Sequence, residues 1–232
     1  MRELTSLVSE QDRRSLAALV DKSTPPEGYQ AELRQLGESL GDALVAKLGA
    51  DLPKHICVVC TVEDADSLGA GMIDRLSALG LGSRVRVVCF WNDRIELNGE
   101  SLAPILKEYR EPCDLDQSVL VVVKSIISSA CVVRTNLASM VAKSNPRRIF
   151  VAAPVMLKGA EANLQSEFVP ELSRRFEYLT LAIDDERDGK MVVPGVGGDI
   201  YVRLGYGGAE QKNRYIPKLV KTRRQQNALL AA

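Results

Sequence analysis

The stretch that decides the fold is VLVVVKSIISSACVVRTNL, which runs from Val119 to Leu137. Its unbroken apolar run, 119–123, predicts a buried strand, and the residues after the Ser and Ala turn predict a helix. A strand that enters a tight turn and then a helix is where α/β proteins often hold phosphate groups. This turn, however, begins with Lys124 and contains neither glycine nor a carboxylate. The sequence therefore raises the question of whether the turn still binds phosphate.

Short apolar runs and helical patterns alternate along the rest of the chain. The apolar runs are HICVVCTV (55–62), RVRVVCFW (84–91), RRIFVAAPV (147–155) and YLTLAI (178–183). Before them, residues 27–48 carry Tyr and Leu at spacings of three and four, which predicts a long helix. Continuously apolar strands that alternate with helices predict a parallel sheet covered on both faces. We therefore expect an α/β fold with a mostly parallel central sheet, flanking helices, and ligands at the carboxyl ends of the strands.

The composition indicates an ordinary globular domain. The 232 residues include 30 basic and 30 acidic side chains, so the overall charge predicts no particular partner. No segment approaches the roughly 20 apolar residues of a membrane helix, and the first residues lack the apolar core of a signal peptide. We expect a cytoplasmic protein with no membrane contact and with reduced thiols.

The few cysteine and histidine residues argue against several classes of active site. Cys57 and Cys60 form a CxxC pattern, but it lies within a predicted strand, where positions three apart face opposite sides. No second cysteine pair stands at zinc-binding spacing. His55 is the single histidine, which argues against a Ser-His-Asp or Cys-His site.

Four further stretches together carry a family resemblance. They are LVDKSTPPEGYQAELRQLG (19–37), DSLGAGMIDRL (66–76), RIFVAAPVMLKGAEAN (148–163) and LTLAIDDERDGKMVVPGVGGDIYVRLGYGG (179–208). In this order they resemble the uracil phosphoribosyltransferase family, from near residue 19 to near residue 208. The resemblance implies one domain, residues 1–208, with the type I phosphoribosyltransferase fold and a small hood from the N-terminal helix and C-terminal strands. It also implies a homodimer.

The resemblance assigns roles to particular positions. The phosphate loop corresponds to Lys124, Ser125, Ser128, Ser129, Ala130 and Cys131. The pyrophosphate loop and the segment that assists it correspond to Ser67, Gly69, Gly71 and Arg94. The base-binding segment corresponds to Val193, Gly195, Gly197 and Asp199.

Several groups with which the family holds phosphoribosyl pyrophosphate are replaced in this chain. The family's carboxylate has become Lys124, its two loop glycines have become Ala130 and Cys131, and the pyrophosphate-loop arginine has become Ser67. A hydrogen bond to a charged group contributes about 1.5–3 kcal/mol, and about 1.4 kcal/mol is a tenfold change in affinity. These replacements predict that binding of the sugar diphosphate is weaker by several orders of magnitude.

The sequence leaves three functions open. We expect a degenerate family member that no longer transfers phosphoribose and that serves as a binding, regulatory or scaffolding component for a pyrimidine or nucleotide. The first alternative is an active uracil phosphoribosyltransferase, which uses Mg²⁺ and converts uracil to UMP. The second is a related nucleotide-processing enzyme with a different substrate.

The turn after the first apolar run is unusually acidic for a loop that faces a diphosphate. Glu63, Asp64 and Asp66 lie close together in it. They form either a solvated acidic turn, which we favour, or a site for a metal such as magnesium. Lys124 either contacts a phosphate or, in the more economical interpretation, pairs with one of these acids. In that interpretation, a swapped ion pair closes the ancestral pocket, and its removal destabilises the fold.

Residues 209–232 form a basic C-terminal extension beyond the family resemblance. The cations between Lys212 and Arg224 have no acidic residue among them. They indicate an anionic partner, either nucleic acid or an acidic protein surface. A solvated extension with a frayed end is the other interpretation.

Overall fold

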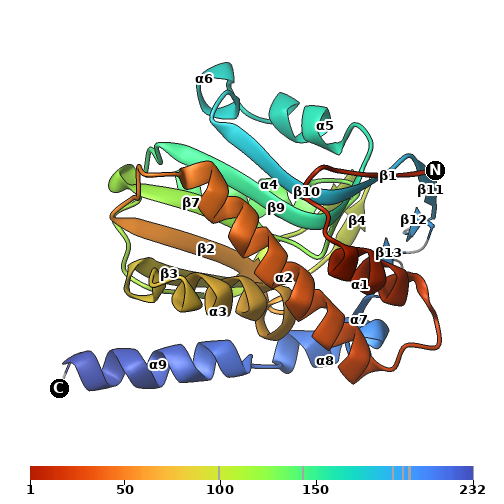
Figure 1. Ribbon diagram of the computed structural model, residues 1–232, viewed down its shortest axis with the longest axis horizontal. Coiled ribbons are helices and arrows are strands. Elements are labelled where there is room, and N and C mark those ends of the chain that lie inside the picture. The colour runs from red at the N-terminus through yellow and green to blue at the C-terminus, as the bar shows by residue number, and fades with distance from the viewer. Residues whose placement is uncertain (99, 143, 190, 195, 198–199, 232) are drawn as a thin grey trace.

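The fold is built on one central sheet. The computed structural model describes residues 1–98, 100–142, 144–189, 191–194, 196–197 and 200–231. Within these ranges, the central sheet has eight strands, seven of them in the order β1-β10-β9-β7-β2-β3-β6, while β8 pairs with β9 (Figure 1). The strands are β1 (Arg2–Leu4), β2 (His55–Thr61), β3 (Val85–Asn92), β6 (Ile105–Arg110), β7 (Ser118–Val123), β8 (Ile126–Ile127), β9 (Arg148–Leu157) and β10 (Phe176–Asp184).

The sheet is mostly parallel, which confirms the fold expected from the sequence. The pairs β3–β2, β2–β7, β7–β9 and β9–β10 are parallel, and only the edge strands β1 and β6 run antiparallel to their neighbours. The chain moves outward from β2 to β3 and then returns to place β7 on the other side of β2. In sheets of this order, the crevice where the direction reverses is the usual ligand site, so the ends of β2 and β7 are the place to examine.

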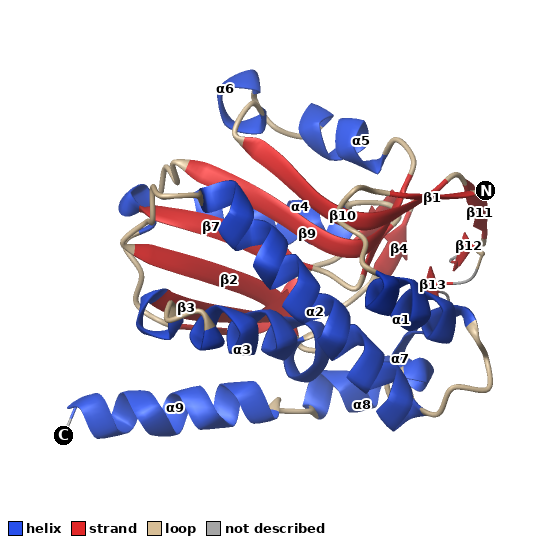
Figure 2. Ribbon diagram, in the orientation of Figure 1, coloured by secondary structure: helices blue, strands red, loops and turns tan. Residues whose placement is uncertain are grey.

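Helices cover both faces of the sheet, as Figure 2 shows. The helices α1 (Glu10–Val20), α2 (Pro26–Leu48) and α3 (Ala70–Ala78) cover one face, and α4 (Cys131–Val141), α5 (Ala160–Ser166) and α6 (Pro170–Ser173) cover the other. Residues of β2 alternate between the two cores, so Cys60 packs on the α2 side and Cys57 on the α4 side. This confirms that the CxxC pair packs the sheet on opposite faces. No described helix has the length and apolar character needed to cross a bilayer.

Smaller elements surround the carboxyl ends of the strands. The sequence predicts only a loose connection through Tyr109, but the structure forms a hairpin of β4 (Ile95–Leu97) and β5 (Glu100–Leu102) and then the edge strand β6. Beyond β10, the strands β11 (Glu186–Asp188), β12 (Met191–Val193) and β13 (Val196–Gly197) form a small antiparallel sheet. The short helix α7 (Ile200–Arg203) follows it.

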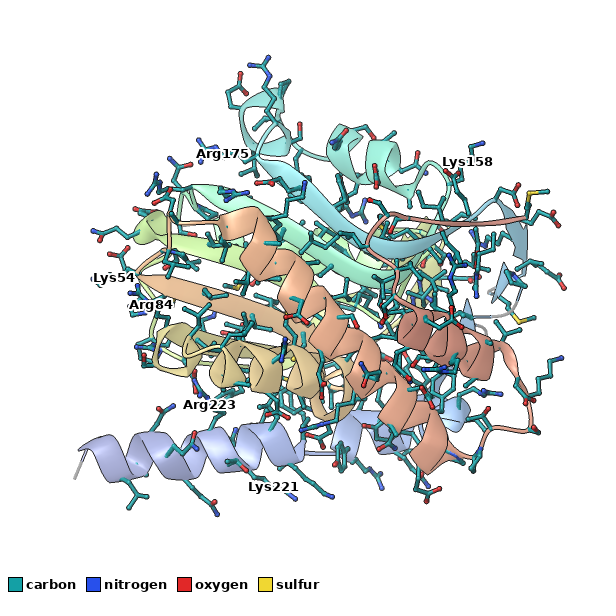
Figure 3. The ribbon with its side chains drawn as sticks, viewed as in Figure 1. Lys54, Arg84, Lys158, Arg175, Lys221 and Arg223 are labelled. Atoms are coloured by element: carbon teal, nitrogen blue, oxygen red, sulfur yellow. The ribbon has the colours of Figure 1, made fainter. Side chains whose placement is uncertain are left out.

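The basic C-terminal extension is helical and packs against the domain. It forms α8 (Ala209–Arg214) and α9 (Lys218–Ala231), and α9 extends beside α3 in Figure 1. Val220 is fully buried, and Figure 3 shows Arg223 directed toward the body of the protein while Lys221 points away from it. Part of the basic charge therefore serves internal contacts.

The contact between α2 and α3 depends on two glycines. A Cβ atom at Gly71 would lie 2.0 Å from the carbonyl oxygen of Arg34, and one at Gly37 would lie 2.2 Å from that of Leu68. Both neighbours are backbone atoms, so a methyl group fits only if the helices move apart. Gly71, which the resemblance places in a pyrophosphate loop, thus has a clear packing role.

Gly71→Ala is expected to lower the free energy of unfolding by about 1–3 kcal/mol, because overpacking forces the backbone to shift. Urea unfolding measures the difference. Gly28→Ala is a suitable control in the first turn of α2, since its nearest neighbour is a side-chain methyl of Thr24 at 3.3 Å. Equal stability of the two variants would contradict the packing role.

Candidate functional site

The site lies where the neighbouring strands β2 and β7 end. Because these strands are parallel and in register, with Val59 opposite Val122, the turns that follow them meet at one edge of the sheet. Lys124 comes from the turn after β7, and its Nζ lies 2.6 Å from Oδ2 of Asp64 and 3.3 Å from Oε1 of Glu63. The two acids come from the turn after β2. The predicted ion pair between Lys124 and the acidic turn is confirmed.

The ion pair between Lys124 and Asp64 is buried. Asp64 is fully buried and Lys124 is 8% exposed. Oδ2 of Asp64 also accepts a hydrogen bond from the Thr61 hydroxyl at 2.9 Å. Burial alone would lower the pKa of Lys124, but the attraction of Asp64 and Glu63 outweighs it and raises that pKa. Lys124 therefore stays charged, and its charge is already directed at two carboxylates.

Little space remains over the phosphate loop. The cavity there has a volume of about 50 Å³, whereas one water molecule occupies about 30 Å³ in the liquid. Its walls include Glu63, Lys124, Ser128 and Ser129, with Ile200 and Tyr201 from α7. The enclosed part of this cavity has room for only a few water molecules, and the rest of it is open to solvent.

Two residues of the predicted phosphate-loop and pyrophosphate-loop groups are in contact. Nη2 of Arg94 donates a hydrogen bond to the Ser129 hydroxyl at 3.0 Å, so the structure brings these two sequence-predicted residues together. Cys131, at the first turn of α4, instead donates its thiol proton to the carbonyl of Ser101 at 2.9 Å. The loop is thus tied to the β4–β5 hairpin, and its serines and Arg94 are the groups that can still contact an anion.

The loop backbone retains a conformation that suits glycine. Ala130 has φ 53° and ψ −8°, which is the left-handed region. This conformation is costly for a residue with a Cβ atom and free of that cost for glycine. The turn therefore has a backbone conformation that suits glycine, although alanine occupies the position.

Ala130→Gly is expected to raise the free energy of unfolding by about 1 kcal/mol, because it relieves the left-handed strain. Ala138→Gly, at an exposed position inside α4, should lower it by about 1 kcal/mol. Thermal and urea unfolding of both variants measure the two signs. A loss of stability in Ala130→Gly would refute the strain at this turn.

The remaining pyrophosphate-loop positions do not join this cavity. Gly69 and Gly71 lie at the contact of α3 with the rest of the protein, and the additional Cβ atom at Gly69 would lie 3.3 Å from the Asp64 carbonyl oxygen. Ser67 is buried and lines a different, larger cavity of about 550 Å³. Arg94 alone of this group reaches the loop.

The predicted base-binding segment is described only in part. Val193 ends β12 and Gly197 ends β13, whereas Gly195 and Asp199 lie outside the described residues. Val196, the first residue of β13, is fully buried in the core. The segment leads into α7, which covers the loop cavity.

The acidic turn does not form the metal site that its sequence allows. Asp66 is directed away from Glu63 and Asp64, because its Oδ2 accepts from the Tyr215 hydroxyl at 2.6 Å and the Lys218 backbone N–H at 2.9 Å. Its carboxylate therefore caps the first turn of α9. Among the residues that the structure describes, no three carboxylate, thiol or imidazole side chains are grouped to hold a metal ion.

The sequence analysis does not place Lys212 at the site. Lys212 is buried, donates from Nζ to the carbonyl oxygen of Asn92, and lies 4.8 Å from the ring centre of Tyr201. Burial lowers the pKa of Lys212. The basic run around Lys212 suggests an exposed side chain, and no local pattern links it to Asn92, which lies 120 residues earlier.

Comparisons with known proteins show the fold. No protein-family model matches the chain, and no curated protein matches it in sequence. The solved structure of the AQ2163 protein from Aquifex aeolicus is similar at 16% identity and a TM-score of 0.68, and the match covers 89% of this chain and 99% of that one.

Other solved structures match more weakly. The hypoxanthine-guanine phosphoribosyltransferase of L. donovani has 14% identity and a TM-score of 0.43, covering 66% of this chain and 77% of that one. The hypoxanthine phosphoribosyltransferase of Trypanosoma cruzi in complex with the product IMP has 10% identity and a TM-score of 0.45. The match covers 67% of this chain and 77% of that one. The chain is thus a mixed α/β protein with a mostly parallel central sheet, and it shares its fold with the Aquifex protein.

Proposed function

We propose that this protein is a uracil phosphoribosyltransferase-like protein that does not transfer phosphoribose and that acts as a pyrimidine- or nucleotide-binding regulatory or scaffolding component. The observation that carries the proposal is the buried contact of Lys124 with Asp64 and Glu63 at the phosphate loop. The four sequence stretches described above supply the link to the uracil family.

The electrostatics of the loop oppose a sugar diphosphate. For Lys124 to bind a phosphate, it has to leave two buried carboxylates, and an uncompensated buried charge costs several kcal/mol. If Lys124 stays in place, Asp64 and Glu63 repel the diphosphate. The enclosed part of the cavity, about 50 Å³, is small for such a ligand, and Ile200 and Tyr201 line it.

A single phosphate group faces a smaller barrier at the outer side of the loop. Arg94 is exposed and bonded to Ser129, and Ser128 lines the same cavity. A guanidinium and two hydroxyls at the start of α4 are groups that bind a monophosphate. The presence of these residues supports the proposal that the protein senses a pyrimidine nucleotide such as UMP.

In the alternative of an active transferase, Ser128 and Ser129 hold the 5-phosphate, and Val193, Gly195 and Asp199 hold the base. This alternative requires, in addition, that substrate and Mg²⁺ displace Lys124 from its carboxylates. The two functions differ in one direct measurement: formation of UMP from uracil and phosphoribosyl pyrophosphate with Mg²⁺. We expect no turnover, and sustained UMP production would refute the proposal.

Binding of nucleotide is measured separately by calorimetry with UMP and with uracil. If the protein is a sensor, UMP binds, and Arg94→Gln weakens that binding by about tenfold or more because a charged contact is lost. Arg174→Gln, at an exposed position in the segment after α6, should leave the affinity unchanged. Equal weakening by both variants would argue against a phosphate contact at Arg94.

A further inference from the structure

A larger cavity lies on the other side of the acidic turn. It has a volume of about 550 Å³. Among the described residues, Glu63 alone lines both this cavity and the cavity over the phosphate loop. Its walls come from the first turns of α2, from the turn after β2, and from the segment that joins α7 to α8. A cavity of this size accommodates a small organic molecule.

Two buried oxygens at this cavity have no hydrogen-bond partner within the described part of the chain. They are the Ser67 hydroxyl oxygen and Oε2 of Glu63. Ser67 is 2% exposed and Glu63 is 6% exposed, and both line the cavity. Buried polar atoms are nearly always bonded, so two of them at one cavity indicate a bound group that supplies hydrogen-bond donors.

Neighbouring polar groups are already engaged and do not satisfy these oxygens. Gln30 donates from Nε2 to the Leu204 carbonyl at 2.7 Å, and Gln211 accepts from the Gly207 N–H at 2.7 Å. Both oxygens of Asp66 are used by Tyr215 and by the backbone of α9.

The nearby cations are engaged as well. Lys124 lies 3.3 Å from Oε1 of Glu63 and closer, at 2.6 Å, to Asp64. Arg214, at the rim of the cavity, is paired with Glu210 at 2.6 Å. Lys212 donates its hydrogen bond to the Asn92 carbonyl. The Oε2 atom of Glu63 is therefore left without a hydrogen-bond partner among the described residues, at a residue that lines the cavity.

An aromatic wall accompanies these acceptors. Tyr206 and Tyr215 line the cavity, and their rings meet edge to face with centres 5.4 Å apart. Burial, together with the neighbouring Tyr215 and the carboxylate of Asp66, raises the pKa of Tyr206, so its phenol stays neutral. An aromatic ring beside a carboxylate favours a flat cation, which gains both the ion pair and a cation–π contact.

We propose that this cavity, formed by Glu63, Ser67 and Tyr206, is a binding site for a small planar organic cation of the amidine, guanidine or protonated aminoheterocycle class. The N–H groups of the ligand donate to Oε2 of Glu63 and to the Ser67 hydroxyl, and its flat body lies against Tyr206. The proposed site does not depend on the proposed function, because none of its residues belongs to the phosphate loop. Glu63 is the one residue of the site that also contacts Lys124.

Benzamidine is a suitable probe, because it carries a planar amidinium on an aromatic ring. Benzamide is the matched control, since it has nearly the same shape but no charge. We expect isothermal titration calorimetry with the full chain to show benzamidine binding at least about tenfold more tightly than benzamide, as loss of one charge-assisted hydrogen bond predicts. No benzamidine binding at millimolar concentration, or equal binding of the two compounds, would overturn the proposal.

Two variants locate the site. Glu63→Gln should weaken benzamidine binding by about tenfold or more, and Ser67→Ala by about two- to tenfold. Ser67→Ala removes a hydroxyl that has no bonding partner among the described residues, so it tests the site even if Glu63→Gln disturbs the Lys124 ion pair.

Glu171→Gln changes an exposed acid on α6, far from these residues in the chain, and should leave the affinity unchanged. If Ser67→Ala and Glu63→Gln both bind benzamidine as the unmodified protein does, the ligand lies elsewhere and the proposal is wrong.

Discussion

Lys124→Met is expected to lower the free energy of unfolding by about 3–5 kcal/mol, because it leaves Asp64 and Glu63 buried without their counter-charge. Both acids are nearly inaccessible to water and cannot recover the lost energy by hydration. Urea unfolding at neutral pH measures the change. Lys221→Met, at an exposed position on α9, is the matched control and should change stability by less than about 0.5 kcal/mol.

A rescue experiment separates the ion pair from simple packing. Adding Glu63→Gln and Asp64→Asn to Lys124→Met removes the uncompensated charges and should restore most of the lost stability. Replacing a complete buried ion pair is often neutral, whereas removing one partner is costly. If Lys124→Met alone costs less than about 1 kcal/mol, or if the triple variant is less stable than the single one, the ion pair does not hold the two strand ends together.

Glu111→Ala is expected to cost about 3–5 kcal/mol and to release α9 from the domain. Glu111 is 2% exposed, and its carboxylate accepts hydrogen bonds from Nη2 of Arg223 at 2.6 Å and from the Val87 backbone N–H at 2.8 Å. It also accepts from the Tyr109 hydroxyl at 2.9 Å and from Asn227 at 3.0 Å. One side chain therefore joins β3, β6 and α9, and its loss removes the acceptor of five hydrogen bonds, because Nε of Arg223 also donates to it at 2.8 Å.

Hydrogen exchange of the α9 amides, together with urea unfolding, measures this effect. Glu108→Ala, on the same strand but exposed and paired with Arg110 at 3.1 Å, should cost less than about 1 kcal/mol. Unchanged protection of α9 in Glu111→Ala would show that the helix is held mainly by its apolar contacts, such as Val220.

The same carboxylate predicts a dependence on pH. Burial alone would raise the pKa of Glu111, but the bonds from Arg223 and from the Val87 N–H outweigh it and lower that pKa below 4.5. A lowered folded-state pKa contributes stability that is present above pH 4.5 and is lost as pH falls through the folded-state value. Below pH 4.5, the unmodified protein should therefore lose stability more steeply than Glu111→Gln does.

The sheet could be predicted from the local sequence pattern, whereas the ion pair was predicted from the family resemblance, in which the two loops serve one ligand. Continuous apolar runs mark the buried parallel strands, and parallel neighbours bring their carboxyl ends together. The pairing of β7 with β2, which brings Lys124 to Asp64, is seen only in the structure.

Other features depend on contacts between distant residues and leave no local signal. Asp66 caps a helix that begins 152 residues later in the chain, so its acidic neighbours suggested a metal site instead. The tail appeared only as a basic run, because Val220 and Arg223 reveal their partners only in three dimensions. The volume left over the phosphate loop depends on Ile200 and Tyr201, whose position above the loop no sequence spacing indicates.

The ion pair of Lys124 with Asp64 and Glu63 is proposed to prevent sugar diphosphates from binding in the cavity over the phosphate loop. Calorimetric titration of the 232-residue chain with phosphoribosyl pyrophosphate and Mg²⁺ tests this proposal most directly. The account predicts no binding up to millimolar concentration. A dissociation constant of about 100 μM or tighter, accompanied by weaker binding in a Ser128→Ala/Ser129→Ala variant, would contradict it.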